Sequence, residues 1–524
     1  MRTTALKIAS LCVVLGLLLT ACVSPAAPAQ NAAPAQSGST TPKNGGTLIA
    51  ARAADAKGLD PHKQTAFSSF RVLELIYDPL LALDKDLNVV PNLAESWKWS
   101  DDGLTLTLKL RTNVKFHNGD PMTADDVKFS YERILDEKTA AAARSFFTAI
   151  DKIDTPDPAT VVFTLKAPNA ALLAAMTNPN SAIISKKQVT GGADPAKDDV
   201  GTGAFKLVKW DPDKTLTLEA NKDFWISGLP HLAGIEFRTI PDESSILAGL
   251  RAGTLDWALI NDPRVAMVAG KDAKIVTLKS PALAYHVLQL NASRDLFKDV
   301  KVRQAISCAI DRSEVLKTAS LGEGELTAPA TSPLYRIPLD GLTCYKKDAD
   351  KAKSLLKDAG KESGLSFKVI VANDEPPTAL AEAQNIQAQL QAIGVTMDIE
   401  QLELGVYVDR WLKGDFDAAV ALNGGNPDPD NMFYRYWHST GNLNKVANYS
   451  SPDLDKLLDQ GRATTDPAKR KEIYTEVQKQ LVDAAPWIWL YVGYEYRVMQ
   501  PYVKNFTPLP NGSLLYLREA WLDK

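Results

Sequence analysis

Residues 366–402 constrain the fold of this chain more than any other stretch. Ser366–Val371 is a short, largely apolar run of strand character, and Val395–Leu402 is a second one. Between them, Pro377–Ile393 has the apolar spacing of an amphipathic helix that stops at Gly394. A strand, a helix and a strand joined by short loops form a βαβ unit, in which the two strands pair in parallel. This stretch therefore predicts an α/β fold.

The first half of the chain is richer in strands. Alternating apolar and polar residues at Leu104–Leu110 and Thr160–Lys166 predict half-buried strands. The turn residues Asp211-Pro-Asp213 predict a hairpin between flanking strands at 204–210 and 215–219. Thr123 opens a capping box, which predicts the start of a helix. Helices are predicted at 124–135, 300–311, 348–359, 452–463 and 467–485.

The chain is too long for one ordinary hydrophobic core. About 480 residues follow position 44, which predicts at least two lobes. The apolar fraction of 45% is that of a globular protein. A strand-rich first half and an α/β second half favour two lobes with a cleft between them.

The first residues have the pattern of an export signal. Arg2 and Lys7 form a short basic region, and Ile8–Leu19 is almost wholly apolar. With a small-residue end, this pattern predicts a secretory signal peptide at residues 1–21; an uncleaved anchor helix is the alternative. The sequence Leu-Thr-Ala-Cys22 resembles a bacterial lipobox, so we expect Cys22 to be the lipidated first residue of the mature chain.

Residues 22–44 are mostly Ala, Pro, Gln, Ser, Thr and Asn. Such a segment buries too little apolar surface to order itself, so we expect a flexible tether. The predicted location is extracytoplasmic, with the chain lipid-anchored in the periplasm or at the outer face of the cell membrane. In such an oxidising compartment, Cys308 and Cys344 either form a disulfide or remain two buried thiols.

Motifs for catalysis, metals and nucleic acid are not evident in the sequence. Its five histidines lack the spacing of a zinc pair, and Gly201-Thr-Gly203 lacks the third glycine of a dinucleotide site. We find neither a G-x-S-x-G elbow nor a phosphate loop. Without Arg2 and Lys7 the formal net charge changes from −4 to −6, and no basic stripe marks a nucleic-acid surface. We expect no enzymatic reaction, metal or cofactor.

Several blocks together resemble the family 5 extracellular solute-binding proteins of ABC importers, which include peptide-, oligosaccharide- and nickel-binding members. The strongest block is AESWKWSDDGLTLTLKLRTNVKFHNGDPMTADDVKFSYERI at 94–134, and VKVRQAISCAIDRSEVL at 300–316 is another. The remaining blocks lie at 200–213, 240–256, 386–402 and 414–433. In family order they span nearly the whole chain after the tether.

The resemblance implies a type II periplasmic-binding-protein fold, with two lobes and an extra subdomain in lobe one. Lobe one would comprise 45–287 and 491–524, with its subdomain at about 70–198, and lobe two would comprise 288–490. Strands near Tyr285–Leu290 and Trp489–Tyr494 would form the hinge. The implied function is that of a monomeric binding component that closes on a small ligand and delivers it to a permease and ATPase complex.

The ionic anchors of the dipeptide-binding members are replaced here. Three residues before the Asp428-Pro-Asp-Asn431 turn, where both the dipeptide- and the oligopeptide-binding members have an ammonium-binding Asp, this chain has Gly425. Asn373 stands where the dipeptide-binding members have a carboxylate-binding Arg. A buried charge without a partner is costly, so the sequence predicts a longer peptide held by backbone hydrogen bonds, or a neutral oligosaccharide.

The candidate ligand contacts come from both predicted lobes. The resemblance points to Thr65, Ala66 and Phe67 in lobe one and to Asn423, Gly424, Gly425 and Asn426 in lobe two, whose amides suit peptide groups or hydroxyls; alternatively, the asparagines only shape a turn. Trp257 and Trp437 are added as candidates for the cleft wall. Two other classes of function remain open: an exported lipoprotein enzyme, and a chemosensory binding protein.

Overall fold

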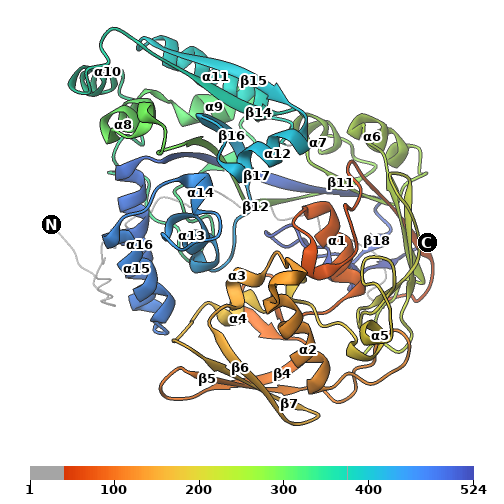
Figure 1. The fold of residues 1–524 in the computed structure, drawn as a ribbon. Coiled ribbons are helices and arrows are strands. Elements are labelled where there is room, and N and C mark those ends of the chain that lie inside the picture. Colours follow the sequence, from red (N-terminus) through yellow and green to blue (C-terminus); the bar gives the residue numbers. More distant parts are fainter. Residues whose placement is uncertain (1–40, 374–375) are drawn as a thin grey trace, which may run out of the picture. The chain divides into compact units, whose positions relative to one another are not determined.

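The computed structural model describes residues 41–373 and 376–524 (Figure 1). The predicted signal peptide, Cys22 and nearly all of the tether lie outside the described residues. No helix within 41–373 and 376–524 is long and apolar enough to cross a membrane.

One long mixed sheet runs through both lobes (Figure 1). At its centre β12 (Val276–Leu290) and β17 (Trp487–Met499) pair antiparallel. β16, β14 and β15 extend the sheet on the β12 side, and β11, β1, β10, β9 and β8 extend it on the β17 side. The short strand β13 (Gly324–Leu326) also pairs with β17. Because β12 and β17 belong to both halves of the sheet, they connect the two lobes.

The second lobe contains the predicted βαβ unit. β14 (Leu365–Ala372) and β15 (Val395–Leu402) pair in parallel along their whole length, and α11 (Ala379–Gln391) connects them. β16 (Ala418–Asn423) continues the sheet. One face packs on α8 (Val300–Ala309), α9 (Arg312–Ala319), α10 (Ala349–Asp358) and α11. The other packs on α12 (Leu404–Lys413), α13 (Pro429–Trp437), α14 (Asn444–Ala447), α15 (Pro452–Ala463) and α16 (Pro467–Ala484).

The first lobe is built on the other half of the sheet. β1 (Thr47–Arg52) pairs in parallel with β10 (Gly234–Thr239) and β11 (Trp257–Ile260). The predicted hairpin is confirmed as β8 (Phe205–Asp211) and β9 (Thr215–Ala220). The lobe's other elements are α1 (Phe67–Ile76), α5 (Lys186–Thr190), α6 (Glu243–Arg251), α7 (Pro263–Ala269), β18 (Val503–Lys504) and β19 (Trp521–Leu522).

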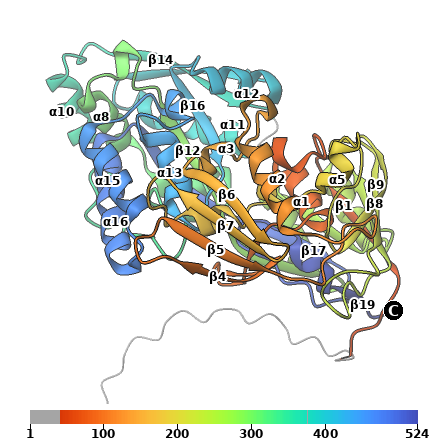
Figure 2. The ribbon, with the colours of Figure 1, turned by 60° about the horizontal axis from the view of Figure 1, so that its bottom comes forward.

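A second, four-stranded antiparallel sheet forms the subdomain, in the order β4-β5-β7-β6 (Figure 2). The predicted strands correspond to β5 (Thr105–Leu110) and β7 (Thr160–Leu165), and β4 (Ala94–Trp99) and β6 (Ile150–Asp157) flank them. In the capping box of α2 (Ala124–Leu135), the Thr123 N–H donates to Asp126 Oδ2 at 2.9 Å. A separate apolar core underlies this sheet. The smaller elements are β2 (Leu81–Leu83), β3 (Val89–Pro91), α3 (Arg144–Phe147) and α4 (Leu172–Ala175).

The two connecting strands are longer than predicted and are interrupted in the middle. Residues 276–281 of β12 pair with 494–499 of β17, and residues 285–289 pair with 487–492. The register shifts between Pro281 and Tyr285. The predicted lobe boundaries at 287 and 490 therefore fall inside paired strands. The interruption also leaves the carbonyl of Leu283 outside the regular ladder, where a neighbouring loop reaches it.

A buried carboxyl joins α1 to the C-terminal segment. Glu74 accepts hydrogen bonds from the Ser513 hydroxyl at 2.6 Å and from the Leu514 N–H. Burial is the main reason why the pKa of Glu74 is raised from 4.5 to about 7. The folded chain therefore holds this proton more tightly than the unfolded chain does.

This shift predicts a pH-dependent loss of stability. Between pH 4.5 and about pH 7 the folded state binds more protons than the unfolded state, so the free energy of unfolding falls as pH rises, by up to about 3 kcal/mol from Glu74. We expect Glu74→Gln to flatten this part of the profile in urea unfolding measured at both ends of the range. Glu95→Gln, at an exposed site in β4, should leave the slope unchanged; an unchanged slope in Glu74→Gln would contradict the assignment.

Candidate functional site

The loop after β16 lies against the interrupted part of β12. Asn423, the last residue of β16, pairs in register with Tyr285, and its Nδ2 lies 3.4 Å from the Tyr285 hydroxyl. Two residues on, the loop approaches the carbonyl of Leu283. The candidate binding loop, residues 423–426, therefore packs directly on the strand that connects the lobes.

Gly425 has no room for a side chain. A Cβ there would lie 1.9 Å from the Leu283 carbonyl oxygen and 2.5 Å from Thr331 Oγ1. Backbone atoms cannot yield to such a contact without moving the strand. In this structure the loop therefore has no space for an acidic side chain at position 425.

The lobe-one candidates meet this loop. Thr65 and Ala66 precede α1, and Phe67 is its first residue. The Cζ atom of Phe67 lies 3.4 Å from the point where a Cβ on Gly424 would stand. Thr65 is exposed, while Ala66 and Phe67 are partly buried. The structure therefore brings the predicted lobe-one and lobe-two groups together at Phe67 and Gly424.

The aspartates of the turn point into lobe two. The Asp428 carboxylate pairs with both terminal nitrogens of Arg470, at 2.5 and 2.7 Å, and its Oδ1 also accepts the Asp430 N–H at the start of α13. Asp430 accepts hydrogen bonds from Arg462 at 2.8 Å and from the Tyr474 hydroxyl at 3.0 Å. Burial raises the pKa of Asp430 although Arg462 lies beside it. Both carboxylates have protein partners that hold the turn in shape.

Asn426 also serves the turn, because its Oδ1 accepts the N–H of Asp428 at 3.1 Å. The turn alternative thus applies to this asparagine. Asn373 is exposed just after β14, and its N–H donates to the Leu402 carbonyl at 2.9 Å. Its backbone is therefore tied to the end of β15.

The two tryptophans proposed for the cleft wall are core residues, so that prediction is wrong. The exposed fraction of Trp257 is 0% and that of Trp437 is 1%. Trp257 packs edge-to-face on Phe506 with ring centroids 5.6 Å apart. Trp437 packs on Trp487 with centroids 4.7 Å apart. Neither ring has surface to offer a ligand in this structure.

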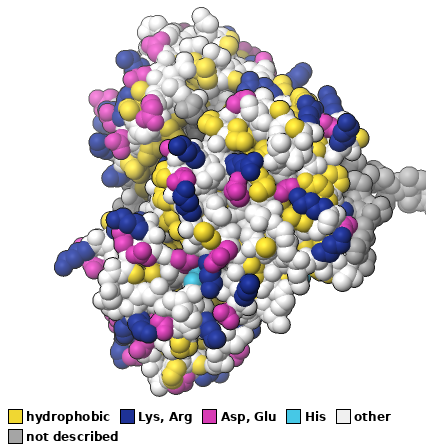
Figure 3. All heavy atoms as spheres, turned by 90° about the vertical axis from the view of Figure 1, so that its right-hand side faces the viewer, with side chains coloured by type: hydrophobic (Ala, Val, Ile, Leu, Met, Phe, Trp, Pro, Cys, Tyr) yellow, Lys and Arg dark blue, Asp and Glu magenta, His cyan; other side chains and the backbone are white. Residues whose placement is uncertain are grey.

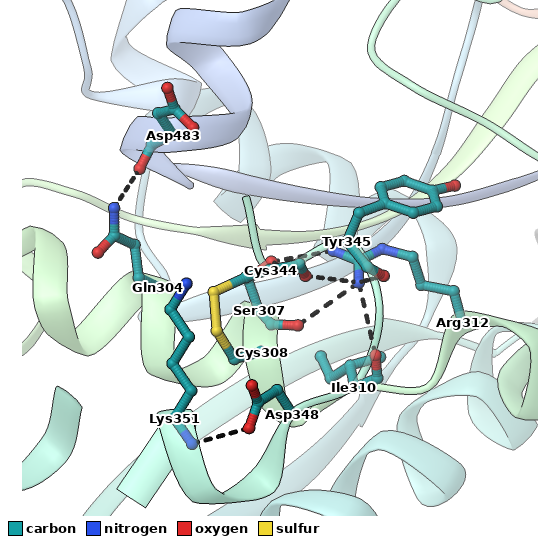
Figure 4. The surroundings of a disulfide bond; sticks show 10 residues. All are labelled: Gln304, Ser307, Cys308, Ile310, Arg312, Cys344, Tyr345, Asp348, Lys351 and Asp483. Carbon is teal, nitrogen blue, oxygen red and sulfur yellow. Dashed lines mark hydrogen bonds between the residues drawn. A yellow bond between two sulfur atoms is a disulfide. The ribbon is translucent and has the colours of Figure 1, made fainter. Parts of the chain in front are cut away.

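Cys308 in α8 and Cys344 form a disulfide (Figure 4). Beside it, the buried guanidinium of Arg312 donates to the carbonyls of Cys344 and Tyr345, at 3.1 and 2.7 Å, and to the Ser307 hydroxyl at 2.9 Å (Figure 4). These contacts fix one end of the long segment between β13 and α10. Because the same segment carries Thr331, the disulfide anchors a wall of the candidate binding loop.

Two further contacts join lobe two to the subdomain. The Arg435 guanidinium carbon lies 5.7 Å from the centroid of Phe146 in α3, and the Ala170 N–H donates to the Arg462 carbonyl at 2.8 Å. The sequence offered no signal for Arg435 or Phe146, because partners on different lobes share neither a motif nor a spacing. The subdomain therefore contributes to the same seam between the lobes.

Charged side chains are mixed on one face of the molecule, and the described residues contain no metal-binding cluster of side chains. On the face shown in Figure 3, cationic and anionic side chains are interspersed and form no continuous patch of one sign. Over residues 41–373 and 376–524, no group of three or more His, Cys, Asp or Glu side chains is placed to hold a metal ion. The candidate site consists instead of amides, hydroxyls, glycines and one aromatic ring.

With this geometry established, comparisons identify the class of protein. Residues 88–444 match the bacterial extracellular solute-binding proteins, family 5 middle region. The match covers more than half of the chain, and the chain belongs to this family. It is a solute-binding protein of the ABC importer type, and its fold is the type II periplasmic-binding-protein fold, with two lobes and an extra subdomain in lobe one.

Individual relatives extend over most of the chain. The glutathione-binding protein GsiB of Pectobacterium atrosepticum is 30% identical over 454 residues, which are 82% of this chain and 86% of the relative. The oligopeptide-binding protein AppA of Bacillus subtilis is 28% identical, covering 100% of this chain and 99% of the relative.

Solved structures agree in fold. The periplasmic binding protein DppA of Helicobacter pylori, in complex with the peptide STSA, has a TM-score of 0.81 and 29% identity, covering 92% of this chain and 99% of that one. The B. subtilis AppA structure, in complex with a nonapeptide, has a TM-score of 0.82 and 26% identity, covering 92% and 100%.

Proposed function

We propose that this chain captures oligopeptides outside the cytoplasm by closing its two lobes, and presents them to the permease of an ABC importer. One observation carries the proposal: Phe67 of lobe one and the Gly424 loop of lobe two meet at the seam between the lobes. A ligand held there touches both lobes and therefore binds the closed state better than the open one.

The ligand class rests on the relatives and on the loop. The DppA structure holds the peptide STSA, the AppA structure holds a nonapeptide, and GsiB is named for a small peptide, glutathione. With no space for an acidic side chain at Gly425, a peptide would be held through its backbone by groups such as Asn423, together with Thr65–Phe67. No observation favours the oligosaccharide prediction.

Closure would require no covalent chemistry. A ligand shifts the balance of open and closed states only by its difference in affinity for them, and about 5.5 kcal/mol turns 1:99 into 99:1. The permease would recognise the closed shape. Binding and release of an unchanged peptide would therefore complete the cycle.

We extend the proposal to how the chain is exported and attached to the membrane. Residues 1–21 would be removed, Cys22 would carry the lipid, and residues 22–44 would tether a monomer to the membrane surface. The lobes would divide at the predicted positions, 45–287 with 491–524 against 288–490.

Peptide binding is tested by thermal shift. We expect oligopeptides of the length of STSA or longer to raise the unfolding temperature, because a ligand at a hundredfold excess over its Kd stabilises by about 2.7 kcal/mol. Dipeptides should give no shift, since the ionic anchor at position 425 is absent. Native mass spectrometry of gently purified protein should show peptides carried unchanged. Stabilisation by sugars alone, or conversion of an added peptide, would contradict the proposal.

A further inference from the structure

Arg435 is an unneutralised cation at the seam between the lobes. Its Nε is buried and has no hydrogen-bond partner among the described residues. Its charge instead faces aromatic rings, 5.7 Å from the centroid of Phe146 and 5.4 Å from that of Tyr436. Within residues 41–373 and 376–524 it forms no ion pair. A buried N–H donor without an acceptor is unfavourable, and a ligand oxygen could satisfy it.

The surroundings of Arg435 place it next to the candidate binding loop. Arg435 lies on α13, which begins at the turn directly after the binding loop. The next residue, Tyr436, is buried in the same apolar cluster as Tyr285, whose hydroxyl lies 3.4 Å from Asn423 Nδ2. The guanidinium therefore lies on the helix that continues from the candidate binding loop.

Other arginines of this lobe have hydrogen-bond acceptors within the protein, such as the carbonyls that accept from Arg312. Arg462 pairs with Asp430 at 2.8 Å, and both terminal nitrogens of Arg470 donate to the Asp428 carboxylate. Arg410, on the surface, pairs with Glu400 at 2.9 Å. Arg435 lacks such a partner, although its α13 begins with the paired aspartates. Because Phe146 lies in the subdomain and Arg435 in lobe two, an anion bound at the guanidinium would be enclosed when the lobes close.

We infer that Arg435 binds a carboxylate of the ligand, so that the preferred ligands are peptides with a free C-terminal or side-chain carboxylate. This inference rests on the proposed function and names the part of the peptide that this site selects. It also supplies a charged anchor on α13, the helix that follows the loop from which the ammonium-binding Asp is missing. Such a site recognises a negatively charged group of the ligand, whereas an ammonium site recognises a positively charged one.

The test compares paired ligands on paired variants. STSA and a nonapeptide pool are prepared with free C-termini and as C-terminal amides, and a third set of amides carries one internal Asp. Affinities are measured by calorimetry for the wild-type chain, Arg435→Gln and Arg410→Gln. A charged hydrogen bond contributes enough to expect a preference of about 10- to 100-fold for the carboxylate forms.

The expected result is that Arg435→Gln removes this preference while its affinity for neutral amides stays close to wild type. Arg410→Gln should keep the full preference. Recovery of affinity by the internal Asp would identify a side-chain carboxylate as the bound group, and no recovery would identify the C-terminus. Peptide binding by the wild type without any carboxylate preference, or an equal loss for both forms in Arg435→Gln, would overturn the inference and leave the proposed function standing. Failure of the wild type to bind any peptide would overturn both.

Discussion

Gly425→Asp is expected to destabilise the folded chain by more than about 4 kcal/mol. The new Cβ would stand 1.9 Å from the Leu283 carbonyl oxygen and 2.5 Å from Thr331 Oγ1. Overfilling a packed site typically costs about 1–3 kcal/mol, and a buried carboxylate without a partner adds several more. The loop would have to move away from β12, and Gly424 would then lose its place opposite Phe67.

The measurement is urea unfolding together with peptide affinity, and the chain offers a matched control. At Gly424 the nearest atom to a new Cβ is the flexible end of Phe67, at 3.4 Å. Gly424→Ala should therefore stay within about 0.5 kcal/mol of wild type. Gly425→Ala should fall between the two, because it adds volume without charge. A Gly425→Asp chain as stable as wild type, and newly able to bind dipeptides, would show that the loop has room for the ammonium anchor.

Local patterns in the sequence predicted local structure well. The βαβ unit, the hairpin of β8 and β9 and the capping box of α2 all lie where the sequence places them. Each depends on residues within one short stretch: the spacing of apolar side chains, a turn, or a hydroxyl and a carboxylate three residues apart. Such interactions can be deduced from the stretch itself.

The full length of the two strands that connect the lobes could not be predicted from such local patterns. The sequence predicted short segments near Tyr285–Leu290 and Trp489–Tyr494, but the pairing extends to Val276 and Met499. The partners are about two hundred residues apart, and Pro281 lies within the first strand, a residue that usually argues against a regular strand. The register shift after Pro281 accommodates it.

The ligand-binding role of residues 65–67 and 423–426 stays a prediction. Phe67 and Gly424 lie close together, and the space at Gly425 is closed by the Leu283 carbonyl in β12 and the Thr331 hydroxyl in the segment anchored by the disulfide. Trp257 and Trp437 were misplaced because a tryptophan's burial depends on neighbours such as Phe506 and Trp487, which are remote in sequence. Contacts between the lobes cannot be predicted from the sequence pattern of either lobe alone.

Arg470→Met should cost about 3–5 kcal/mol of folding free energy. The Asp428 and Arg470 side chains are only 12% and 5% exposed and form two short hydrogen bonds, so removing the guanidinium leaves a buried carboxylate unpaired. Asp428→Asn in the same background removes the stranded charge and should recover much of the loss. The double-mutant cycle thus measures the pair itself, by urea unfolding of the four chains.

The same cycle decides what the Asp-Pro-Asp-Asn turn does. If Asp428 holds the turn, as its bonds to Arg470 indicate, the variants should lose stability together, and peptide affinity should fall only as far as the loop is displaced. Arg410→Met, which breaks a surface pair with Glu400, should change stability by less than about 1 kcal/mol. A stable Asp428→Asn chain that no longer binds peptides would assign the carboxylate to the ligand instead, and the binding loop would then have to turn outward from Arg470 when a peptide arrives.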